Sequence, residues 1–446
     1  MTGIRTDWTV RPGGRLAGRL RVPGDKSVSH RAVMLGAIAE GVTEVTGFLE
    51  GADCLATMGA FRAMGVPIEG PEGGRLVVRG VGLHGLEAPA APLDLGNSGT
   101  SMRLLAGLLA GQPFDSVLTG DASLSRRPMR RVTEPLKRMG AHIETTPEGT
   151  APLRIHGNPR LRGIDYRTPV ASAQVKSAIL LAGLYAAGRT CVTEPAPTRD
   201  HTERMLAGFG WPVAREPERL RVCLEGGHRL RATAVDVPAD LSSAAFFLVG
   251  ASIAPGSDVE LEHVGLNPTR TGVIEILRRM GADLEVTPEG EAGGEPVGRI
   301  RVRAARLRGI AIPSELVPLA IDEFPAVFVA AACAEGRTVL TGAAELRVKE
   351  SDRIQVMAAG LRALGVRAEP RHDGILIEGV GPDGRLGGGT VASHGDHRIA
   401  MAFAMAALRA EGPVVIRDCA NVATSFPGFD ALAREAGLAL ETGTAA

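Results

Sequence analysis

The chain has 446 residues, which is more than one hydrophobic core usually serves, so its length predicts two domains. Hydrophobic residues make up 44% and charged residues 22%, a composition that excludes a disordered chain. Fifty Lys and Arg residues balance fifty Asp and Glu residues, and aromatic residues make up only 3%, which argues against nucleic-acid and membrane-surface binding.

Neither a membrane span nor a disulfide framework is predicted. The longest apolar stretches, such as residues 244–254, are shorter than the ~20 residues that cross a bilayer, and no apolar block follows the N-terminal arginines. The five cysteines are odd in number, widely spaced and without a CxxC pair. We therefore expect a cytoplasmic protein in a reducing compartment, with no disulfide framework and no zinc site.

A repeated helix ending divides the chain into six parts. An amphipathic stretch ends in glycine and is followed by a strand-like run, and this pattern recurs at intervals of 70 to 84 residues. Each glycine is expected just past a helix C-terminus, in the left-handed backbone region. The six glycines are Gly65, Gly140, Gly210, Gly281, Gly365 and Gly437.

A second type of helix alternates with the first and is rich in Ala, Leu and Met on nearly every side. Such helices belong inside a core. They are predicted at residues 27–39, 98–110, 171–187, 241–254, 323–334 and 397–410. Each repeat then supplies one buried helix, one outer helix and several short strands. The predicted fold is α/β, with two similar domains of three repeats each.

The buried helices begin with polar residues, although their bodies are apolar. Ser, Asn and Asp at these points are explained by ordinary N-capping, which is the preferred interpretation for Ser242 and Ser243. Capping does not require the Lys, Arg and Gln residues that accompany several of the starts. Helix N-termini with such donors are suited to binding anions. We expect these ends to point inward and the substrate to lie between the domains.

Eight short motifs carry the charged residues of these helix starts and of the loops beside them. In chain order they are PGDKSVSHR (23–31), LGNSGTSMR (95–103), RRPM (126–129), ASAQVKSA (171–178), TRDHTE (198–203), IDEFP (321–325), RVKESDR (347–353) and DHRIAMA (396–402). Lys and Arg in the first five are suited to clamping carboxylate or phosphate. The last three place carboxylates beside several cations, an arrangement that separates acid from base roles.

Lysine usage favours a functional reading of these motifs. Only four of the fifty basic residues are lysine, and Lys26, Lys176 and Lys349 lie inside the motifs. Arginine serves at an ordinary solvated surface, whereas an ammonium is a compact point charge that can also exchange a proton. Lysine is therefore found where the motifs indicate chemistry.

In order and in sequence, the eight motifs resemble those of the enolpyruvyl transferases, and the SAQ and TRDHTE forms are similar to the class II bacterial members that act on shikimate 3-phosphate. The likeness runs from about Val22 to Phe429. It implies two inside-out α/β domains, each with three repeats of buried helices and surrounding sheets. The implied ranges are residues 21–236 for the first domain and residues 1–20 with 237–446 for the second.

The resemblance also implies a reaction. The enolpyruvyl group of phosphoenolpyruvate moves to the 5-hydroxyl of shikimate 3-phosphate, and phosphate leaves through a tetrahedral intermediate. Neither a cofactor nor a metal is implied. The expected partners are these two small molecules alone, with no nucleic acid and no membrane. We further expect a monomer that closes when shikimate 3-phosphate binds.

Matching the motifs one by one to those of the family implies a role for individual residues. Asp322 resembles the base that takes the hydroxyl proton, Glu350 the group that protonates the methylene, and Lys26 a competing proton carrier. The residues that resemble the shikimate 3-phosphate site are Lys26, Ser27, Arg31, Ser172, Ala173, Gln174, Arg199, Asp322 and Lys349. Those that resemble the phosphoenolpyruvate site are Lys26, Gly99, Arg127, Gln174, Arg353 and Arg398.

Two positions affect what the resemblance implies. Class I members carry a lysine before a late TFP motif where this chain reads ATSFP (423–427), so the resemblance does not imply an anion contact from that loop. Gly99 stands where some glyphosate-tolerant members carry alanine, so we expect this chain to be a glyphosate target. Other functions remain open: the related transferase acting on UDP-N-acetylglucosamine, whose usual loop cysteine is missing from residues 121–129, a non-catalytic phosphometabolite-binding protein, and a repeat-fold RNA-end enzyme.

Overall fold

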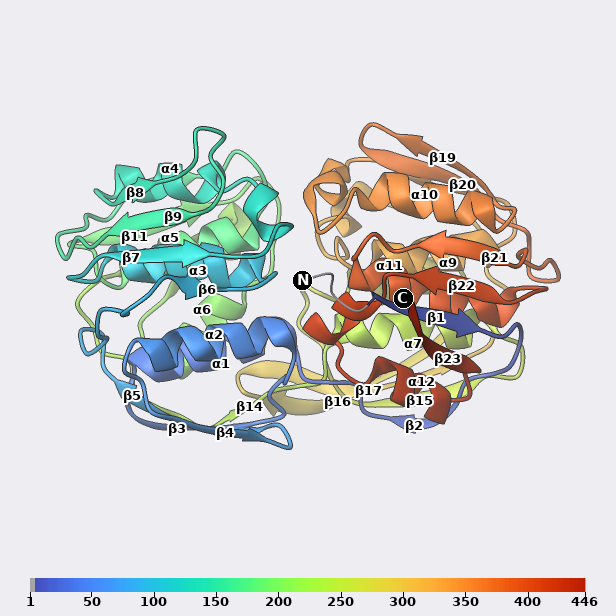
Figure 1. Cartoon of the computed structure of the whole chain (residues 1–446), viewed down its shortest axis with the longest axis horizontal. Coiled ribbons are helices and arrows are strands. Elements are labelled where there is room, and N and C mark those ends of the chain that lie inside the picture. Colours follow the sequence, from blue (N-terminus) through green and yellow to red (C-terminus); the bar gives the residue numbers. More distant parts are fainter. Residues whose placement is uncertain (1–4, 446) are drawn as a thin grey trace. The chain divides into compact units, whose positions relative to one another are not determined.

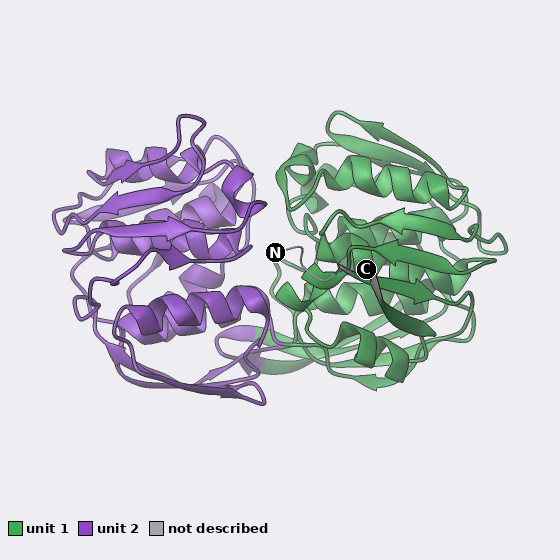
Figure 2. Cartoon of the chain, viewed as in Figure 1, with its two compact units in different colours: residues 1–23, 239–290, 296–446 green, residues 24–238, 291–295 purple. Residues whose placement is uncertain are grey.

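The computed structural model describes residues 5–445, which form two compact units of mixed α/β structure (Figures 1 and 2). Unit 2 consists of Gly24–Pro238 and Glu291–Glu295, and unit 1 of the other described residues. Glu291–Glu295 lies inside the range 237–446 predicted for the second domain but belongs to unit 2. There, Glu295 Oε1 lies 2.6 Å from Nδ1 of the buried His201.

The predicted buried helices form the centre of each unit. Unit 2 contains α1 (Lys26–Ile38), α3 (Gly99–Ala110) and α5 (Ala173–Gly183), and unit 1 contains α7 (Leu241–Ile253), α9 (Phe324–Cys333) and α11 (His397–Ala406). Every residue of α7 and α9 is buried. The helix predicted at 171–187 ends earlier, because the Ala187 N–H donates to the carbonyl of Leu161 in an isolated β-bridge with Arg162.

The outer helices end at the glycines identified from the sequence. These helices are α2 (Ala52–Ala63), α4 (Arg130–Arg138), α6 (His201–Gly208), α8 (Gly272–Arg279), α10 (Arg353–Ala363) and α12 (Phe429–Glu435). The six glycines that follow them have φ between 80° and 113°, a region that residues with a Cβ rarely adopt. The prediction of six left-handed glycines past helix ends is confirmed.

Three four-stranded sheets surround the helices of unit 2 (Figure 1). In spatial order they are β14 (Val235–Asp236), β3 (Glu40–Thr46), β5 (Arg75–Val81) and β4 (Ile68–Glu72); β6 (Leu93–Asp94), β7 (Ser116–Thr119), β9 (Leu153–His156) and β8 (His142–Glu144); and β10 (Asp165–Arg167), β11 (Arg189–Thr193), β13 (Arg221–Glu225) and β12 (Ala214–Glu216). In each sheet the first pair is parallel and the others are antiparallel.

Unit 1 repeats this plan with one shorter sheet. Its strands are β16 (Asp283–Ala292), β17 (Glu295–Arg303), β15 (Asp258–Gly265) and β2 (Ala17–Leu20); β18 (Arg337–Leu340), β20 (Gly374–Glu378) and β19 (Arg367–Arg371); and β21 (Gly389–Ala392), β22 (Val414–Arg417), β1 (Arg5–Val10) and β23 (Leu440–Ala445). Strands β1 and β2 come from the start of the chain. The buried apolar side chains of each unit form a core of their own.

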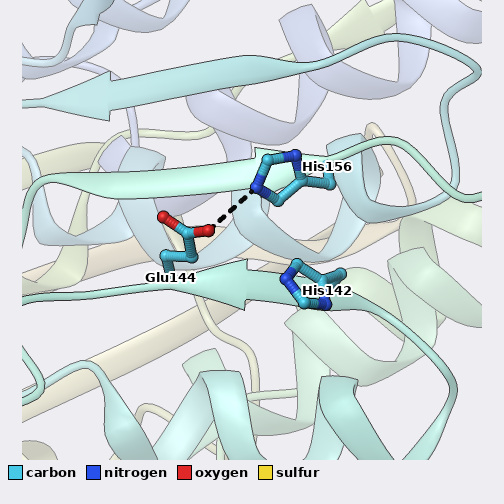
Figure 3. A group of neighbouring side chains, drawn as sticks. All are labelled: His142, Glu144 and His156. Atoms are coloured by element: carbon cyan, nitrogen blue, oxygen red, sulfur yellow. Dashed lines mark hydrogen bonds and ion pairs between the residues drawn. The ribbon is translucent and has the colours of Figure 1, made fainter.

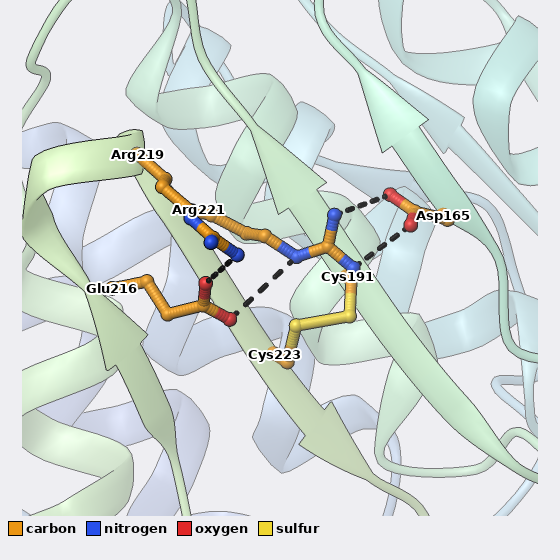
Figure 4. Close-up of a disulfide and its surroundings, with 6 residues drawn as sticks. All are labelled: Asp165, Cys191, Glu216, Arg219, Arg221 and Cys223. Carbon is orange, nitrogen blue, oxygen red and sulfur yellow. Dashed lines mark hydrogen bonds and ion pairs between the residues drawn. A yellow bond between two sulfur atoms is a disulfide. The ribbon is translucent and has the colours of Figure 1, made fainter.

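One cysteine pair contradicts the expectation that the chain holds no disulfide. Cys191 on β11 and Cys223 on β13 are joined by a disulfide (Figure 4). They are direct partners in the antiparallel register. The Cys191 N–H points away from β13, toward the carbonyl of Ile164, so the two cysteines form a non-hydrogen-bonded pair, in which side chains lie closest. Cys54, Cys333 and Cys419 are buried and take no part in this disulfide.

Within residues 5–445, no helix combines the length and apolar character that crossing a bilayer requires.

Candidate active site

The first predicted motif opens α1 in unit 2 and places Lys26 at the first helical position. Oδ1 of Asp25 accepts a hydrogen bond from the Val28 N–H at 2.9 Å and caps the helix. Lys26 Nζ lies 3.1 Å from Oδ2 of Asp53, in the first turn of α2. The side chain of Lys26 is 17% exposed, so its ammonium is held in place yet still reaches solvent.

Arg31 lies one turn further along α1 and is fixed by three groups. Its Nε donates to Oγ1 of Thr202 at 2.8 Å, one Nη to Oγ of Ser177 at 2.9 Å, and the other Nη to the carbonyl of Ser27 at 3.0 Å. Burial lowers the pKa of Arg31 to about 10, so the side chain stays cationic at neutral pH. Arg199, just before α6, adds a second positive charge to its surroundings.

The start of α3 gathers two guanidinium groups around Gly99. Oγ of Ser98 caps this helix by accepting the Ser101 N–H at 3.1 Å. Arg127, 7% exposed, donates to Oδ1 of Asn97 at 2.6 Å. A Cβ added at Gly99 would lie 3.1 Å from a guanidinium nitrogen of Arg127 and of Arg103 alike. The glycine therefore lets both cations approach the helix backbone.

The start of α5 lies beside the start of α3. Oγ of Ser172 caps α5 by accepting the Val175 N–H at 3.5 Å, and Ala173 is the first helical residue. Nε2 of Gln174 donates to Oγ1 of Thr100 at 3.0 Å, and Oε1 of Gln174 accepts a bond from Arg103. Gln174 therefore connects the two helix starts.

Lys176 is buried between two carboxylates and has a structural role. It is 3% exposed, and its Nζ lies 2.7 Å from Glu194 and 2.8 Å from Glu203. Burial alone would lower the pKa of Lys176, but the two carboxylates outweigh burial and raise it. The lysine is therefore a buried cation between α5, α6 and the loop before α6.

In unit 1, one buried arginine binds carboxylates from three predicted motifs. Arg353, at the start of α10, is 1% exposed. Its guanidinium donates to Oδ1 of Asp322 at 3.3 Å, to Oε2 of Glu350 at 2.7 Å and to Oδ2 of Asp396 at 2.9 Å. Burial alone would lower the pKa of Arg353, but Asp396, Glu350 and Asp322 raise it. The carboxylates of Asp322 and Glu350 thus share one fixed cation.

Lys349 completes this cluster. Its Nζ lies 3.4 Å from Oδ1 of Asp322, and the two side chains are 22% and 15% exposed. Because the side chain of Glu350 is also 19% exposed, both carboxylates remain partly accessible while Arg353 does not. The arrangement presents an acid and a base candidate to solvent over a buried positive charge.

The start of α11 supplies the third side of the cluster. Oδ1 of Asp396 caps this helix by accepting the Arg398 N–H at 3.0 Å. Oδ2 of Asp396 accepts hydrogen bonds from Oγ of Ser351 at 3.0 Å and from Nε of Arg353. Arg398 and His397 are 7% and 3% exposed. Asp396 thus joins the start of α11 to the loop that carries Glu350.

The predicted site residues therefore form groups within each unit. Unit 2 carries those at or near the starts of α1, α3, α4, α5 and α6, and unit 1 carries those at or near the starts of α9, α10 and α11. Unit 2 holds Lys26, Ser27, Arg31, Gly99, Arg127, Ser172, Ala173, Gln174 and Arg199; unit 1 holds Asp322, Lys349, Glu350, Arg353 and Arg398. That both groups bind one pair of substrates stays a prediction, as does each individual role.

Three contributing residues were not assigned a role from the sequence. Asp53 has no motif of its own, and only the packing of α2 beside α1 brings it to Lys26. Arg103 and Asp396 lie within two of the motifs, but the residues that they bind, Gln174 and Arg353, are distant in the chain. One available signal was the repeat itself, because Asp396 occupies the same helix-capping position as Asp25 and Asp240.

Comparison with known proteins identifies the family. A family model described as EPSP synthase (3-phosphoshikimate 1-carboxyvinyltransferase) matches residues 10–432. A protein named 3-phosphoshikimate 1-carboxyvinyltransferase from Alkalilimnicola ehrlichii is 72% identical over 98% of this chain and 97% of its own length. One of the same name from Methylococcus capsulatus is 70% identical over 97% of this chain and 98% of its own.

Solved structures agree with the fold and confirm the predicted fold class. EPSP synthase from Acinetobacter baumannii superposes with a TM-score of 0.88 at 60% identity, covering 98% of this chain and 100% of that one. The enolpyruvyl transferase NikO from Streptomyces tendae, at 17% identity, shares the fold with a TM-score of 0.79 over 99% of this chain and 100% of that one. The chain belongs to the EPSP synthase (3-phosphoshikimate 1-carboxyvinyltransferase) family of enolpyruvyl transferases.

Proposed function

We propose that the chain transfers the enolpyruvyl group of phosphoenolpyruvate to the 5-hydroxyl of shikimate 3-phosphate and releases phosphate. Membership of the family supports the reaction, and one structural observation carries its chemistry. Asp322 and Glu350 are two partly exposed carboxylates bound to the same buried guanidinium, that of Arg353. Two fixed carboxylates in reach of solvent are what addition and elimination with opposite proton transfers require.

The addition step needs a base and an acid at the same time. In our proposal Asp322 takes the proton of the 5-hydroxyl while the oxygen of that hydroxyl bonds to C2 of phosphoenolpyruvate. At the same time Glu350 donates a proton to C3, which becomes a methyl group. The Lys349 ammonium lies 3.4 Å from Oδ1 of Asp322 and helps to hold this carboxylate in place. Lys26 remains the competing proton carrier for the methylene.

Elimination then reverses the proton transfer from Glu350 to C3. The bond from C2 to the phosphate oxygen breaks, the methyl group returns a proton to Glu350, and the enol ether double bond forms. Arg353 keeps Glu350 in one position through both steps because it donates to Oε2 at 2.7 Å and is itself buried. The carboxylate is thus oriented without being removed from solvent.

In our proposal the helix starts bind the two anionic substrates, shikimate 3-phosphate and phosphoenolpyruvate. Lys26, Ser27, Arg31, Ser172, Ala173, Gln174, Arg199, Asp322 and Lys349 bind shikimate 3-phosphate, and Lys26, Gly99, Arg127, Gln174, Arg353 and Arg398 bind phosphoenolpyruvate. Oriented N–H groups and cations at helix N-termini support both assignments. Arg31 and Arg127 are buried, and hydrogen bonds to Thr202, Ser177 and Asn97 hold their guanidinium groups in place.

Phosphate release with each substrate omitted in turn tests the proposal. We expect release only when phosphoenolpyruvate and shikimate 3-phosphate are both present. Release with UDP-N-acetylglucosamine in place of shikimate 3-phosphate would favour the related transferase. Tight binding of both ligands without release would favour a non-catalytic binding protein. A cytoplasmic location and a monomeric state stay predictions.

A further inference from the structure

Three potential metal ligands lie together on the outer face of the sheet formed by β6, β7, β9 and β8. His142 and Glu144 come from β8 and His156 from β9 (Figure 3). One ligand atom from each residue lies within 4.8 Å of the others. The cluster is separate from every residue assigned to substrate binding or catalysis.

The register of the two strands fixes this arrangement. His142 pairs directly with His156, and Glu144 follows two positions after His142, so all three project from one face. The residues between them, Ile143 and Ile155, point to the opposite face and are 2% and 1% exposed. Because the isoleucines anchor the strands in the core, a shift in register that would separate the three ligands is disfavoured.

His156 is already oriented as a metal ligand. Its Nδ1 lies 3.0 Å from Oδ2 of Asp115, and its Nε2 lies 3.2 Å from Oε1 of Glu144. Oδ1 of Asp115 also accepts the Gly157 N–H at 3.2 Å, which holds the carboxylate in place. A carboxylate bound to one ring nitrogen fixes the tautomer and presents the other nitrogen to a metal.

The imidazole of His142 lies close to that of His156. The ring centroids of His142 and His156 are 4.9 Å apart at an interplanar angle of 63°. Two ligands of one Zn²⁺ ion at bond lengths of about 2.0–2.2 Å lie roughly 3.3 Å from each other. The side chains of Glu144 and His156 are 55% and 42% exposed, so small rotations can bring the ligand atoms to that spacing.

We propose that His142, Glu144 and His156 bind one divalent transition-metal ion on the outer face of β8 and β9, with Asp115 positioning His156. The ion replaces the proton between Nε2 of His156 and Glu144, and water completes its coordination. Two imidazoles with one carboxylate suit Zn²⁺, Ni²⁺ or Cu²⁺, whereas Mg²⁺ and Ca²⁺ prefer oxygen ligands throughout.

The test is Zn²⁺ titration of the full chain without an affinity tag, after treatment with a chelator that is then removed. Calorimetry or competition with a chromophoric chelator measures affinity and stoichiometry. We expect one Zn²⁺ per chain, unaffected by excess Mg²⁺. His142→Ala and His156→Ala should each weaken this binding about tenfold or more, and Asp115→Asn about 10- to 100-fold.

His372→Ala is the matched control, since His372 is an exposed histidine in the turn between β19 and β20. It should leave Zn²⁺ affinity unchanged. Circular dichroism confirms that each variant is folded, and Co²⁺ substitution gives a visible spectrum that reports the ligands directly. Absence of binding by the wild-type chain, or equal affinity in the double variant His142→Ala/His156→Ala, would overturn the proposal.

Discussion

Nζ of Lys349 lies 3.4 Å from Oδ1 of Asp322, and the same oxygen accepts a hydrogen bond from Arg353 at 3.3 Å. Two cations therefore contact one oxygen of a carboxylate that is 15% exposed. The carboxylate is thereby held in one position beside the two cations. Asp322 is therefore a positioned and partly accessible carboxylate, as a base for a hydroxyl group must be.

Asp322→Asn should reduce kcat strongly with little change in KM. The amide keeps the shape of the carboxylate but cannot accept the hydroxyl proton, so we expect kcat to fall about 10²- to 10⁴-fold. Steady-state kinetics with both substrates measures this. Glu369→Gln, at an exposed position of β19, is the control and should keep full activity. Equal turnover by Asp322→Asn would remove Asp322 from the mechanism.

Arg353→Met should destabilise unit 1 as well as abolish activity. Removing the guanidinium leaves Asp322, Glu350 and Asp396 without their shared cation, which should lower the free energy of unfolding by about 3–5 kcal/mol. Denaturant unfolding measures this change. In the exposed pair of Arg367 and Glu378, the substitution Arg367→Met should cost less than about 1 kcal/mol. Comparable losses in the two variants would show that the buried network contributes no special stability.

Gly99→Ala should impair phosphoenolpyruvate binding through its contact with the two arginines. The new methyl group would lie 3.1 Å from guanidinium nitrogens of Arg103 and Arg127, so both must shift by a few tenths of an ångström. We expect KM for phosphoenolpyruvate to rise about tenfold and glyphosate inhibition to weaken. Gly59→Ala, on α2 with no atom within 4 Å, is the matched control. Unchanged KM and inhibition in Gly99→Ala would separate this glycine from the phosphoenolpyruvate site.

Breaking the disulfide should destabilise the protein without changing its catalytic residues. Cys191 and Cys223 are 32 residues apart, and closing a loop of that length contributes about 2–4 kcal/mol. Denaturant unfolding with and without a reductant, together with the Cys223→Ser variant, measures the difference. Thiol titration of the denatured, unreduced chain should find three reactive thiols, those of Cys54, Cys333 and Cys419. Five reactive thiols would contradict the pairing.

The metal-free protein should show a histidine with a raised pKa. Hydrogen bonds from His156 to Asp115 and Glu144 raise its pKa above the ordinary value of about 6.5, so the folded state favours the protonated ring. The resulting stability is present below pH 6.5 and is lost as the pH rises through the folded-state pKa. An NMR titration of the imidazole signals measures this. In Asp115→Asn the pKa should fall, and an unchanged value would show that Asp115 is not its cause.

The repeated architecture could be predicted because it depends on local signals. A glycine past an amphipathic helix needs only its neighbours to be identified, and Gly65 and Gly437 have the expected positive φ. The buried helices were equally visible, because α7 is apolar on every side. These signals recur in every repeat, so errors at single boundaries, such as the end of α5, left the fold intact.

Contacts across strands and between helices could not be predicted from such signals. Cys191 meets Cys223 only because of the register between β11 and β13, and the spacing of the cysteines gave no sign of it. The pairing of His142 with His156 depends in the same way on β8 and β9. Motif resemblance located Arg353, but its hydrogen bonds join three carboxylates from separate segments that only the folded chain brings together.

Reaction in deuterium oxide, followed by proton and phosphorus NMR, tests the central claim most directly. If the chain transfers an enolpyruvyl group through protonation of C3, inorganic phosphate and an enol ether of shikimate 3-phosphate should appear together, with deuterium in the vinyl positions. No product should form when either substrate is omitted. Phosphate released from phosphoenolpyruvate alone, or an enol ether without deuterium, would contradict the account.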